Sequence, residues 1–241
     1  MWGTKIKDLP FKLVVQSEIE IWRAADFWTK EPETIAWIDS FAQGSVFWDI
    51  GANVGVFSLY SILSRKVKAV SFEPDEHNFL RLTDQLNANL EDLKKDWDEY
   101  WGCEQYAISD FDGKSTFYVP KSGPGRSGGQ IGKPVDDAGR EFKPAESYEV
   151  ETYKIDTLAG RLGVPNHIKI DVDGHEWSIL QGGAETLANP EVKSVLVEVN
   201  NCHDQIEPFM VGLGFGSFNR FNGQDINRRA NKKSRNVIYT R

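Results

Sequence analysis

The sequence predicts an α/β protein built on a mostly parallel β-sheet with helices on both faces. Short apolar segments alternate with amphipathic segments along most of the 241 residues, as they do in chains of repeated strand–helix–strand units. A glycine-rich turn joins the first regular strand to the first regular helix, which is typical of such units. The chain finishes on two apolar segments joined by a polar loop, and these predict a terminal antiparallel hairpin.

The composition bounds the class of protein. Hydrophobic residues make up 40% of the chain and eight residues are Trp, which excludes a wholly disordered protein. The length suits one domain with a sizeable core. The net charge of −8 argues against sequence-independent nucleic-acid binding, because such proteins place a basic face against the phosphates. We therefore expect no nucleic-acid partner.

Targeting signals are also absent from the pattern. No apolar run reaches the roughly 20 residues that a membrane span needs, and residues 1–10 lack the apolar region of a signal peptide. Cys103 and Cys202 lie far apart and outside any metal or redox motif, as in a reducing compartment. We expect a cytoplasmic protein without a membrane span.

Residues 1–44 are predicted to form an N-terminal extension with a helix packed on the core. Residues 11–15 have the pattern of a short strand. Residues 31–44 predict a helix, because Pro32 is tolerated in a first turn, apolar residues recur at three-residue spacing and Gly44 stops the pattern.

The main domain is predicted over residues 45–241, where the alternation becomes regular. The predicted strands are 45–50, 67–74, 102–109, 166–172 and 192–199, followed by 215–221 and 235–241 in the hairpin. The predicted helices are 54–64, 77–90, 176–189 and 204–214. One stretch at about 120–147 is rich in Gly and Pro and has no periodicity. It is interpreted either as a lid over the acceptor or as a disordered excursion.

The turn "DIGANVG" is the first candidate binding site. A dinucleotide fingerprint would place glycine where Asn53 stands, between Gly51 and Gly55. Asp49 directly precedes the turn and would sit badly beside a pyrophosphate. An acid there suits a ligand with positive charge, such as the ammonium and sulfonium of S-adenosylmethionine. A nicotinamide dinucleotide is therefore the weaker alternative.

Glu73 closes the second predicted strand about 20 residues after the turn, the distance at which an acid accepts hydrogen bonds from ribose hydroxyls. In the alternative interpretation the glycines only make a tight turn and the acids are solvated. Asp49, the two glycines and Glu73 lie at strand ends in one strand–helix–strand unit. This combination favours a ligand site.

Four segments in order, "DIGANVGVFS", "SFEPDEHNFLRL", "AISDFDGKSTF" and "IKIDVDGHEWSILQGG", resemble the FkbM-type S-adenosylmethionine-dependent methyltransferases. The resemblance covers roughly residues 45–200. It implies a Rossmann-like class I methyltransferase fold, with a seven-stranded, mostly parallel sheet and a terminal antiparallel hairpin. It also implies O-methyl transfer to a hydroxyl of a sugar or polyketide, so that a glycan or small molecule is the expected acceptor.

The resemblance also implies cofactor-binding residues. Asp49, Gly51, Asn53 and Gly55 would hold the methionine portion, and Glu73 the ribose. The end of the third strand would flank the adenine, and this assignment comprises Tyr106, Ala107 and Ser109.

Three residues are candidates for the chemistry, because methyl transfer to an alcohol must align the acceptor oxygen and remove its proton. Asp171 stands at a strand end and could position the hydroxyl or act as base. His175 is a candidate base by its ordinary pKa, and Glu198 ends the next strand. The structural alternatives are a turn cap, a helix-start histidine that binds a neighbouring turn, and an ordinary strand-end acid.

Two further features stay open at this point. Asp171, Asp173, Glu198 and Asn200 offer the oxygen ligands that Mg²⁺ or Ca²⁺ prefers, but the resemblance does not require a metal and none is predicted. The basic run at 228–235 is either a solvated hairpin loop or a phosphate contact. Two alternatives to sugar methylation are a non-carbohydrate hydroxyl as acceptor and a non-catalytic protein that binds the cofactor.

Overall fold

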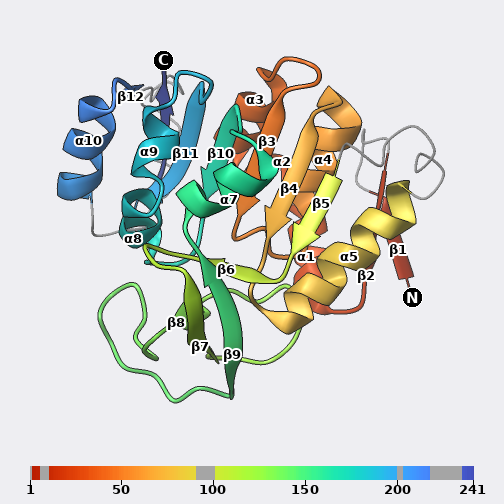
Figure 1. The fold of residues 1–241 in the computed structure, drawn as a ribbon. Coiled ribbons are helices and arrows are strands. Elements are labelled where there is room, and N and C mark those ends of the chain that lie inside the picture. Colours follow the sequence, from red (N-terminus) through yellow and green to blue (C-terminus); the bar gives the residue numbers. More distant parts are fainter. Residues whose placement is uncertain (1, 6–10, 91–100, 200–202, 218–234) are drawn as a thin grey trace.

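The computed structural model describes residues 2–5, 11–90, 101–199, 203–217 and 235–241. Its larger sheet has seven strands: β3 (Val46–Ile50), β4 (Lys68–Phe72), β5 (Trp101–Glu104), β10 (His167–Ile170), β11 (Ser194–Val199), β12 (Gly216–Ser217) and β13 (Arg235–Thr240). They lie in the order β12–β13–β11–β10–β3–β4–β5 (Figure 1). The strands from β11 to β5 are parallel, and β13 is antiparallel to both its neighbours. This confirms the predicted fold class.

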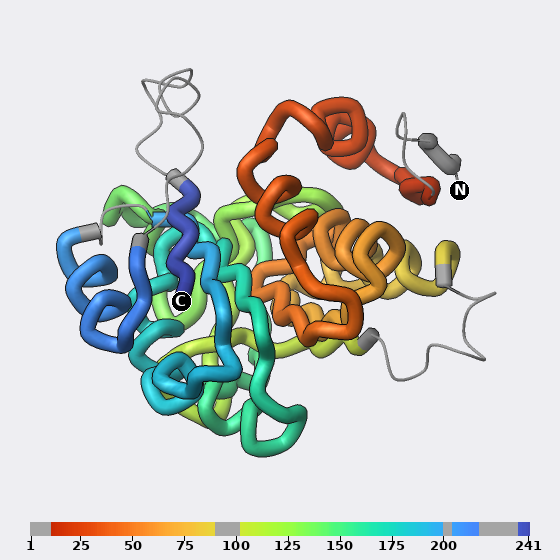
Figure 2. Tube along the Cα trace, turned by 90° about the horizontal axis from the view of Figure 1, so that it is seen from above, coloured from red at the N-terminus to blue at the C-terminus, as the bar shows by residue number. Residues whose placement is uncertain are grey.

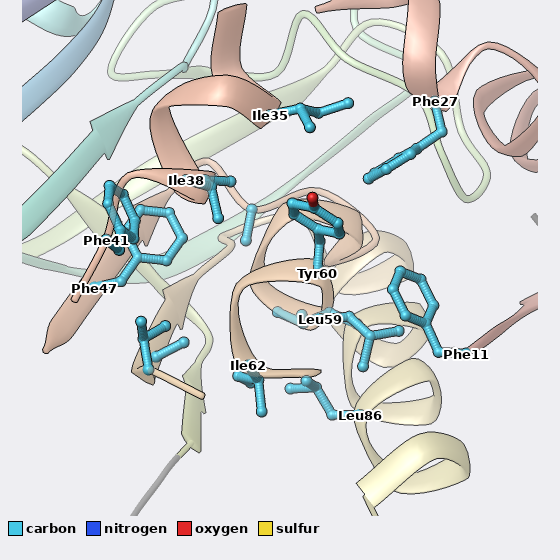
Figure 3. Packing of buried hydrophobic residues seen from close by; sticks show 14 of the residues in the cluster. Phe11, Phe27, Ile35, Ile38, Phe41, Phe47, Leu59, Tyr60, Ile62 and Leu86 are labelled. Carbon is cyan, nitrogen blue, oxygen red and sulfur yellow. The ribbon is translucent and has the colours of Figure 1, made fainter. Parts of the chain in front are cut away.

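Helices cover both faces of this sheet (Figure 1). One face carries α3 (Pro32–Asp39), α4 (Val56–Arg65) and α5 (Glu76–Leu90), and the other carries α7 (Ile155–Leu162), α8 (Glu176–Gln181), α9 (Ala184–Ala188) and α10 (His203–Gly212). Alternate residues of a strand point to opposite faces. Phe47 therefore packs in the core under α3 and α4, while Trp48 packs in the core under α7 to α10. Figure 3 shows the first core, in which Phe47 lies beside Phe41 and the cluster continues to Leu59 and Ile62.

The N-terminal segment joins the first of these cores. It comprises β1 (Trp2–Lys5), β2 (Lys12–Val15), α1 (Glu18–Ala25) and α2 (Phe27–Lys30). Figure 2 shows the part from β2 to α2 beside α4 and α5. Phe11 and Phe27 are buried in the same cluster as Leu59 (Figure 3). Glu20 and Arg81 form a buried ion pair of 2.9 Å that links α1 to α5. The boundary between residues 44 and 45 stays a prediction.

A second sheet corrects the prediction of one strand over 102–109. The chain leaves β5 at Glu104 and, after Gln105, enters β6 (Tyr106–Ile108). β6 pairs with β9 (Glu146–Tyr153) and not with β4, so the segment is divided between two sheets. β7 (Gly113–Val119) and β8 (Gln130–Ile131) complete the order β6–β9–β7–β8. This sheet lies beyond the carboxyl ends of the parallel strands (Figure 1).

Two other expectations change. The helix predicted over 176–189 is two helices, because the chain bends at Gly182, where a Cβ would come within 2.1 Å of the Ser109 carbonyl oxygen. The stretch 120–147 holds β8 and a bridge between Val135 and Glu141, so the disordered alternative is wrong.

Some predictions fall on residues outside the described ranges. Of the strand predicted over 215–221, the structure describes β12, and residues 218–221 lie outside; so do residues 228–234 of the basic run and Asn200. Within the described part of the chain, no helix has the length and apolar character to cross a membrane.

Candidate active site

The predicted turns meet where the strand order reverses. Across the sheet, β4 and then β5 lie on the outer side of β3, and β11 and then β13 lie on the outer side of β10. In open α/β sheets, ligands bind at the carboxyl ends of the strands at this position. Residues 51–55 follow β3 and residues 171–175 follow β10, so both turns lie at the same edge.

Close packing explains the two glycines of the first turn. Gly51 has φ 79°, and a Cβ there would come within 2.0 Å of the carbonyl oxygen of Asp171. Gly55 has φ 80°, and its Cβ would come within 2.3 Å of Leu82 Cδ1. A side chain at Gly51 would therefore push β3 away from β10, because it would meet backbone, whereas one at Gly55 would require the Leu82 side chain to shift.

Asp49 lies under this turn and is 1% exposed. Its Oδ2 accepts a hydrogen bond of 2.6 Å from Ser58, whose Oγ in turn accepts one of 2.8 Å from Ser71. Burial raises the pKa of Asp49, against the opposing effect of Lys169. Among the described residues Asp49 Oδ1 has no hydrogen-bond partner although it is buried. Such an oxygen needs a donor.

Asn53 and Glu73 face each other across the turn. Asn53 has φ 52°, and its backbone N–H donates to Glu73 Oε2 at 2.7 Å, while Asp75 N–H donates to Oε1 at 3.0 Å. Burial raises the pKa of Glu73 to about 8, against the effect of these hydrogen bonds. A carboxylate has about four acceptor positions, so Glu73 keeps capacity for further donors.

The residues assigned to the adenine lie on or after β6, not at the end of the third strand. Tyr106 packs edge-on against Tyr153 with 4.7 Å between ring centroids. Ala107 is buried in the core of the second sheet. Ser109 is fully buried, and its Oγ lies 2.8 Å from His175 Nε2. The residue that ends the third strand is Glu104, which was not predicted as a site residue.

Asp171, directly after β10, and Glu198, near the end of β11, form a pair. A hydrogen bond joins the two carboxyl groups, and the Asp171 side chain is 26% exposed. Burial, followed by the charge of Asp171, raises the pKa of Glu198 to about 8. Burial also acts to raise the pKa of Asp171, but the Lys169 ammonium and the hydrogen bonds hold it at about 2. The two carboxyl groups thus shift in opposite directions, Glu198 toward the protonated form and Asp171 toward the ionised form.

Lys169 is a site residue that the sequence reasoning missed. It lies on β10 opposite Asp49 of β3, its side chain is 2% exposed, and its Nζ lies 2.6 Å from Asp171 Oδ2. The available signal was a lysine within an apolar strand, "HIKI", where both faces of the sheet are covered. A lysine that cannot reach solvent from such a strand needs an acidic partner.

His175 forms its hydrogen bond with a residue outside this pair. It precedes α8, and its Nε2 contacts Ser109 Oγ at 2.8 Å. Burial lowers the pKa of His175, against the effect of Asp110. In the described ranges no hydrogen bond or ion pair links it to Asp171 or Glu198. The structure therefore brings Asp171 and Glu198 together and gives His175 a different partner.

Residues 124–130 pass over this edge of the sheet. Asn53 Nδ2 donates to the Arg126 carbonyl at 2.7 Å, and Gly128 N–H donates to Asp173 Oδ2 at 2.7 Å. From α1, Arg23 Nε donates to the Gly125 carbonyl at 2.8 Å. The segment is thus bound to both turns and to the N-terminal extension.

The oxygen-rich set proposed for a metal has other partners. Lys169 contacts Asp171, and Asp173 accepts from Gly128. Across the described residues no three His, Cys, Asp or Glu side chains are grouped to hold a metal ion. Asn200, the fourth member of the set, lies outside those residues.

Comparisons with known proteins give the same family as the motifs. The family model described as "Methyltransferase FkbM domain" matches residues 49–220. The chain is 27% identical over 203 residues to the hexuronic acid methyltransferase AglP of Haloferax volcanii, covering 82% of this chain and 72% of that protein. It is 28% identical over 188 residues to the AMB antimetabolite synthetase AmbE of Pseudomonas aeruginosa, covering 66% of this chain and 8% of that protein.

A solved structure has the same fold. The methyltransferase FkbM of Methylobacillus flagellatus superposes with a TM-score of 0.58 at 13% identity, over 94% of this chain and 56% of its own. Our chain thus spans little more than half the length of that solved chain. Since the family model matches most of the sequence, including both turns at the carboxyl edge, the chain belongs to the FkbM family and is an S-adenosylmethionine-dependent methyltransferase.

Proposed function

We propose that this methyltransferase transfers its methyl group to a hydroxyl of a sugar, carried by a glycan, a nucleotide-linked sugar or a glycosylated metabolite. The observation that carries the proposal is the position of Asp171 and Glu198 at the carboxyl ends of the neighbouring strands β10 and β11, beside the turn of Gly51, which packs against the Asp171 carbonyl. Support for a sugar comes from AglP, whose name records a hexuronic acid as its substrate.

The cofactor would lie along the turn after β3. The residues proposed to hold it are Asp49, Gly51, Asn53, Gly55, Glu73, Tyr106, Ala107 and Ser109. Two observations support this set: the buried Oδ1 of Asp49 has no donor among the residues that the structure describes, and Glu73 has acceptor capacity left. When bound, S-adenosylmethionine supplies an electrophilic methyl group on a positively charged sulfur.

Asp171 and Glu198 would take the proton of the acceptor. With the cofactor bound, the acceptor oxygen would take the methyl group and the sulfur would keep the electrons of the carbon–sulfur bond, so the chain's own residues have to align the hydroxyl and accept its proton. The hydroxyl proton passes to the carboxylate of Asp171, which the Lys169 ammonium favours in its ionised form. A hydroxyl suits this site better than a carboxylate acceptor, because the acids would repel a second negative charge.

The alternatives carry less support. His175 remains a candidate base, but its Nε2 is bound to Ser109. The lack of a glycine at position 53 and the presence of Asp49 disfavour a nicotinamide dinucleotide. A non-carbohydrate hydroxyl would use the same acids, so the acceptor panel must include one.

The test uses methyl-labelled S-adenosylmethionine with glycans, nucleotide-linked sugars, hexuronic acids and polyols. We expect label in a sugar ether that survives alkali. An alkali-labile ester would overturn the hydroxyl assignment, and transfer to polyols alone would overturn the sugar. Asp171→Asn should lower kcat by on the order of 10²–10⁴ while calorimetry still detects cofactor binding. Asp84→Asn, on the middle of α5, is the matched control.

A further inference from the structure

Lys169 is a buried cation inside the sheet. Its side chain is 2% exposed, its Nζ lies 2.6 Å from Asp171 Oδ2, and Asp49 is its register partner on β3. The Nζ also lies 5.3 Å from the centroid of the Phe57 ring. Burial acts to lower the pKa of Lys169, but Asp171, Asp49 and Glu31 together raise it. The ammonium therefore stays charged, since an unpaired buried amine would lose its proton.

This cation acts on one carboxylate oxygen of Asp171. An ammonium at 2.6 Å fixes Oδ2 and favours the ionised form of the group. Part of the Asp171 side chain remains exposed beyond the strand end, where an acceptor would lie. Lys169 thus holds Oδ2 of Asp171 and Glu198 bonds to the same carboxyl group, while the exposed part of the side chain can face a substrate.

We propose that Lys169 is a positioning residue of the methyl-transfer reaction, whose ammonium keeps the Asp171 carboxylate ionised and oriented toward the acceptor hydroxyl. The inference rests on the proposed role of Asp171. It also explains how Asp171 can stay ionised among several other acids. The Lys169 ammonium supplies the positive charge that a divalent metal would supply in a cluster of carboxylates.

Removing this charge changes the balance around Asp171. Acids from several elements face Asp171. Besides Lys169, the described cation that lowers the pKa of Asp171 is Lys30, at the end of α2. The charged groups that face Asp171 are Lys169 of β10, Asp49 of β3, Lys30, Glu198 of β11, and Asp173 and Glu176 after β10. Without Lys169, repulsion among the acids favours protonation of Asp171 near neutral pH.

The test replaces Lys169 with an uncharged residue of similar length. Lys169→Met should lower kcat at least 100-fold while the KM for S-adenosylmethionine changes less than threefold. The variant should also gain an acid limb in its pH–rate profile, because Asp171 must now lose a proton before it can act. Lys114→Met is the matched control, since Lys114 also lies 2.6 Å from a carboxylate, Glu149, but is 61% exposed on the second sheet.

A direct readout does not depend on methyl transfer. With aspartate carboxyl carbons labelled, NMR titration of the protein should show Asp171 ionised at pH 5 in the parent and protonated at pH 5 in Lys169→Met. Asp171→Asn identifies the signal. If the titration changes as expected but no sugar is methylated, the proposed function fails and the role of Lys169 toward Asp171 stands. An unchanged titration overturns the inference.

A second variant covers the case in which Lys169→Met fails to fold. Lys169→Met combined with Asp171→Asn removes both charges of the buried pair. Because Lys169 acts through Asp171, the double variant should have the residual kcat of Asp171→Asn within threefold. A further loss of 100-fold on adding Lys169→Met to Asp171→Asn would show that Lys169 acts independently of Asp171 and would overturn the proposal.

Discussion

The side-chain amides of Asn53 and Asn78 donate hydrogen bonds to one acceptor, the carbonyl oxygen of Arg126, at 2.7 and 3.0 Å. Asn78 also accepts the Gly125 N–H at 2.8 Å. Asn53 belongs to the turn after β3 and Asn78 to α5, so a single peptide group joins the turn, the helix and the segment above them.

Asn78→Ala should therefore loosen residues 124–130. The change removes two hydrogen bonds to the segment, each worth about 1 kcal/mol, and backbone amides there should exchange with solvent on the order of tenfold faster. Hydrogen exchange by mass spectrometry measures this. Asn89→Ala is the control, because Asn89 lies on the same helix but binds Lys12 of β2. Equal exchange in both variants would show that Asn78 does not hold the segment.

The turnover number should rise with pH and level off above about pH 8. Below that value Glu198 keeps its proton and occupies the Asp171 carboxylate with its hydrogen bond, whereas above it Glu198 is ionised and Asp171 accepts the hydroxyl proton more readily. Asp171, with a pKa of about 2, adds no limb in this range. The measurement is kcat against pH from 5 to 10 with saturating substrates.

Two variants identify the group that titrates. Glu198→Gln should remove the ascending limb, while Glu149→Gln, on the second sheet, should keep it. If the limb stays in Glu198→Gln and disappears in His175→Gln, the histidine is the base and the pair is not.

Gly51→Ala and Gly44→Ala separate backbone strain from close packing. Both glycines have φ 79°, but a Cβ at Gly44 would meet nothing within 4 Å, whereas one at Gly51 would meet the Asp171 carbonyl. Gly44→Ala should cost about 1–3 kcal/mol for the backbone alone. Gly51→Ala should cost more and weaken cofactor binding, because β3 and β10 must move apart. Urea unfolding and calorimetry measure the two effects, and equal losses would contradict the packing argument.

Arg81→Met should destabilise the fold by about 3–5 kcal/mol, because it leaves the buried Glu20 carboxylate without its ion-pair partner. Adding Glu20→Gln should restore part of that loss, since the buried charge is then gone. Thermal unfolding checks both variants. Arg140→Met, which breaks an exposed arginine–aspartate pair, should leave the melting temperature unchanged. A similar effect of Arg81→Met and Arg140→Met would contradict this interpretation.

The sheet and the glycine turn were predictable because their signals are local. A stretch of about ten residues contains the whole signal. It consists of an apolar strand followed by a turn that needs left-handed backbone at Gly51 and Gly55. The strand ends at Asp49, Asp171 and Glu198 follow from the same pattern. Parallel strands bring these ends to one edge, so local reading was enough to place them near each other.

Pairings between distant segments were not predictable in the same way. One apolar run contains β5 and β6, and only the availability of β9 as a partner divides it after Glu104. His175 contacts Ser109 because the bend at Gly182 brings α8 against the end of β6. To predict Lys169 as a site residue, one would have to know that helices cover both faces of β10. In each case the tertiary partner decides, and periodicity carries no information about it.

The segment bound across the carboxyl edge, residues 124–130, is no part of the strands of the seven-stranded sheet. Its length and sequence can vary while the register of β3, β4, β10 and β11 stays the same, since loops tolerate insertion and deletion better than the elements they connect. Chimeras that exchange this segment between relatives would therefore alter the wall of the site while the carboxylates and the glycine turn stay in place. Substrate choice can thus be engineered in one part of the chain while the residues that carry out the reaction, in another part, are left unchanged.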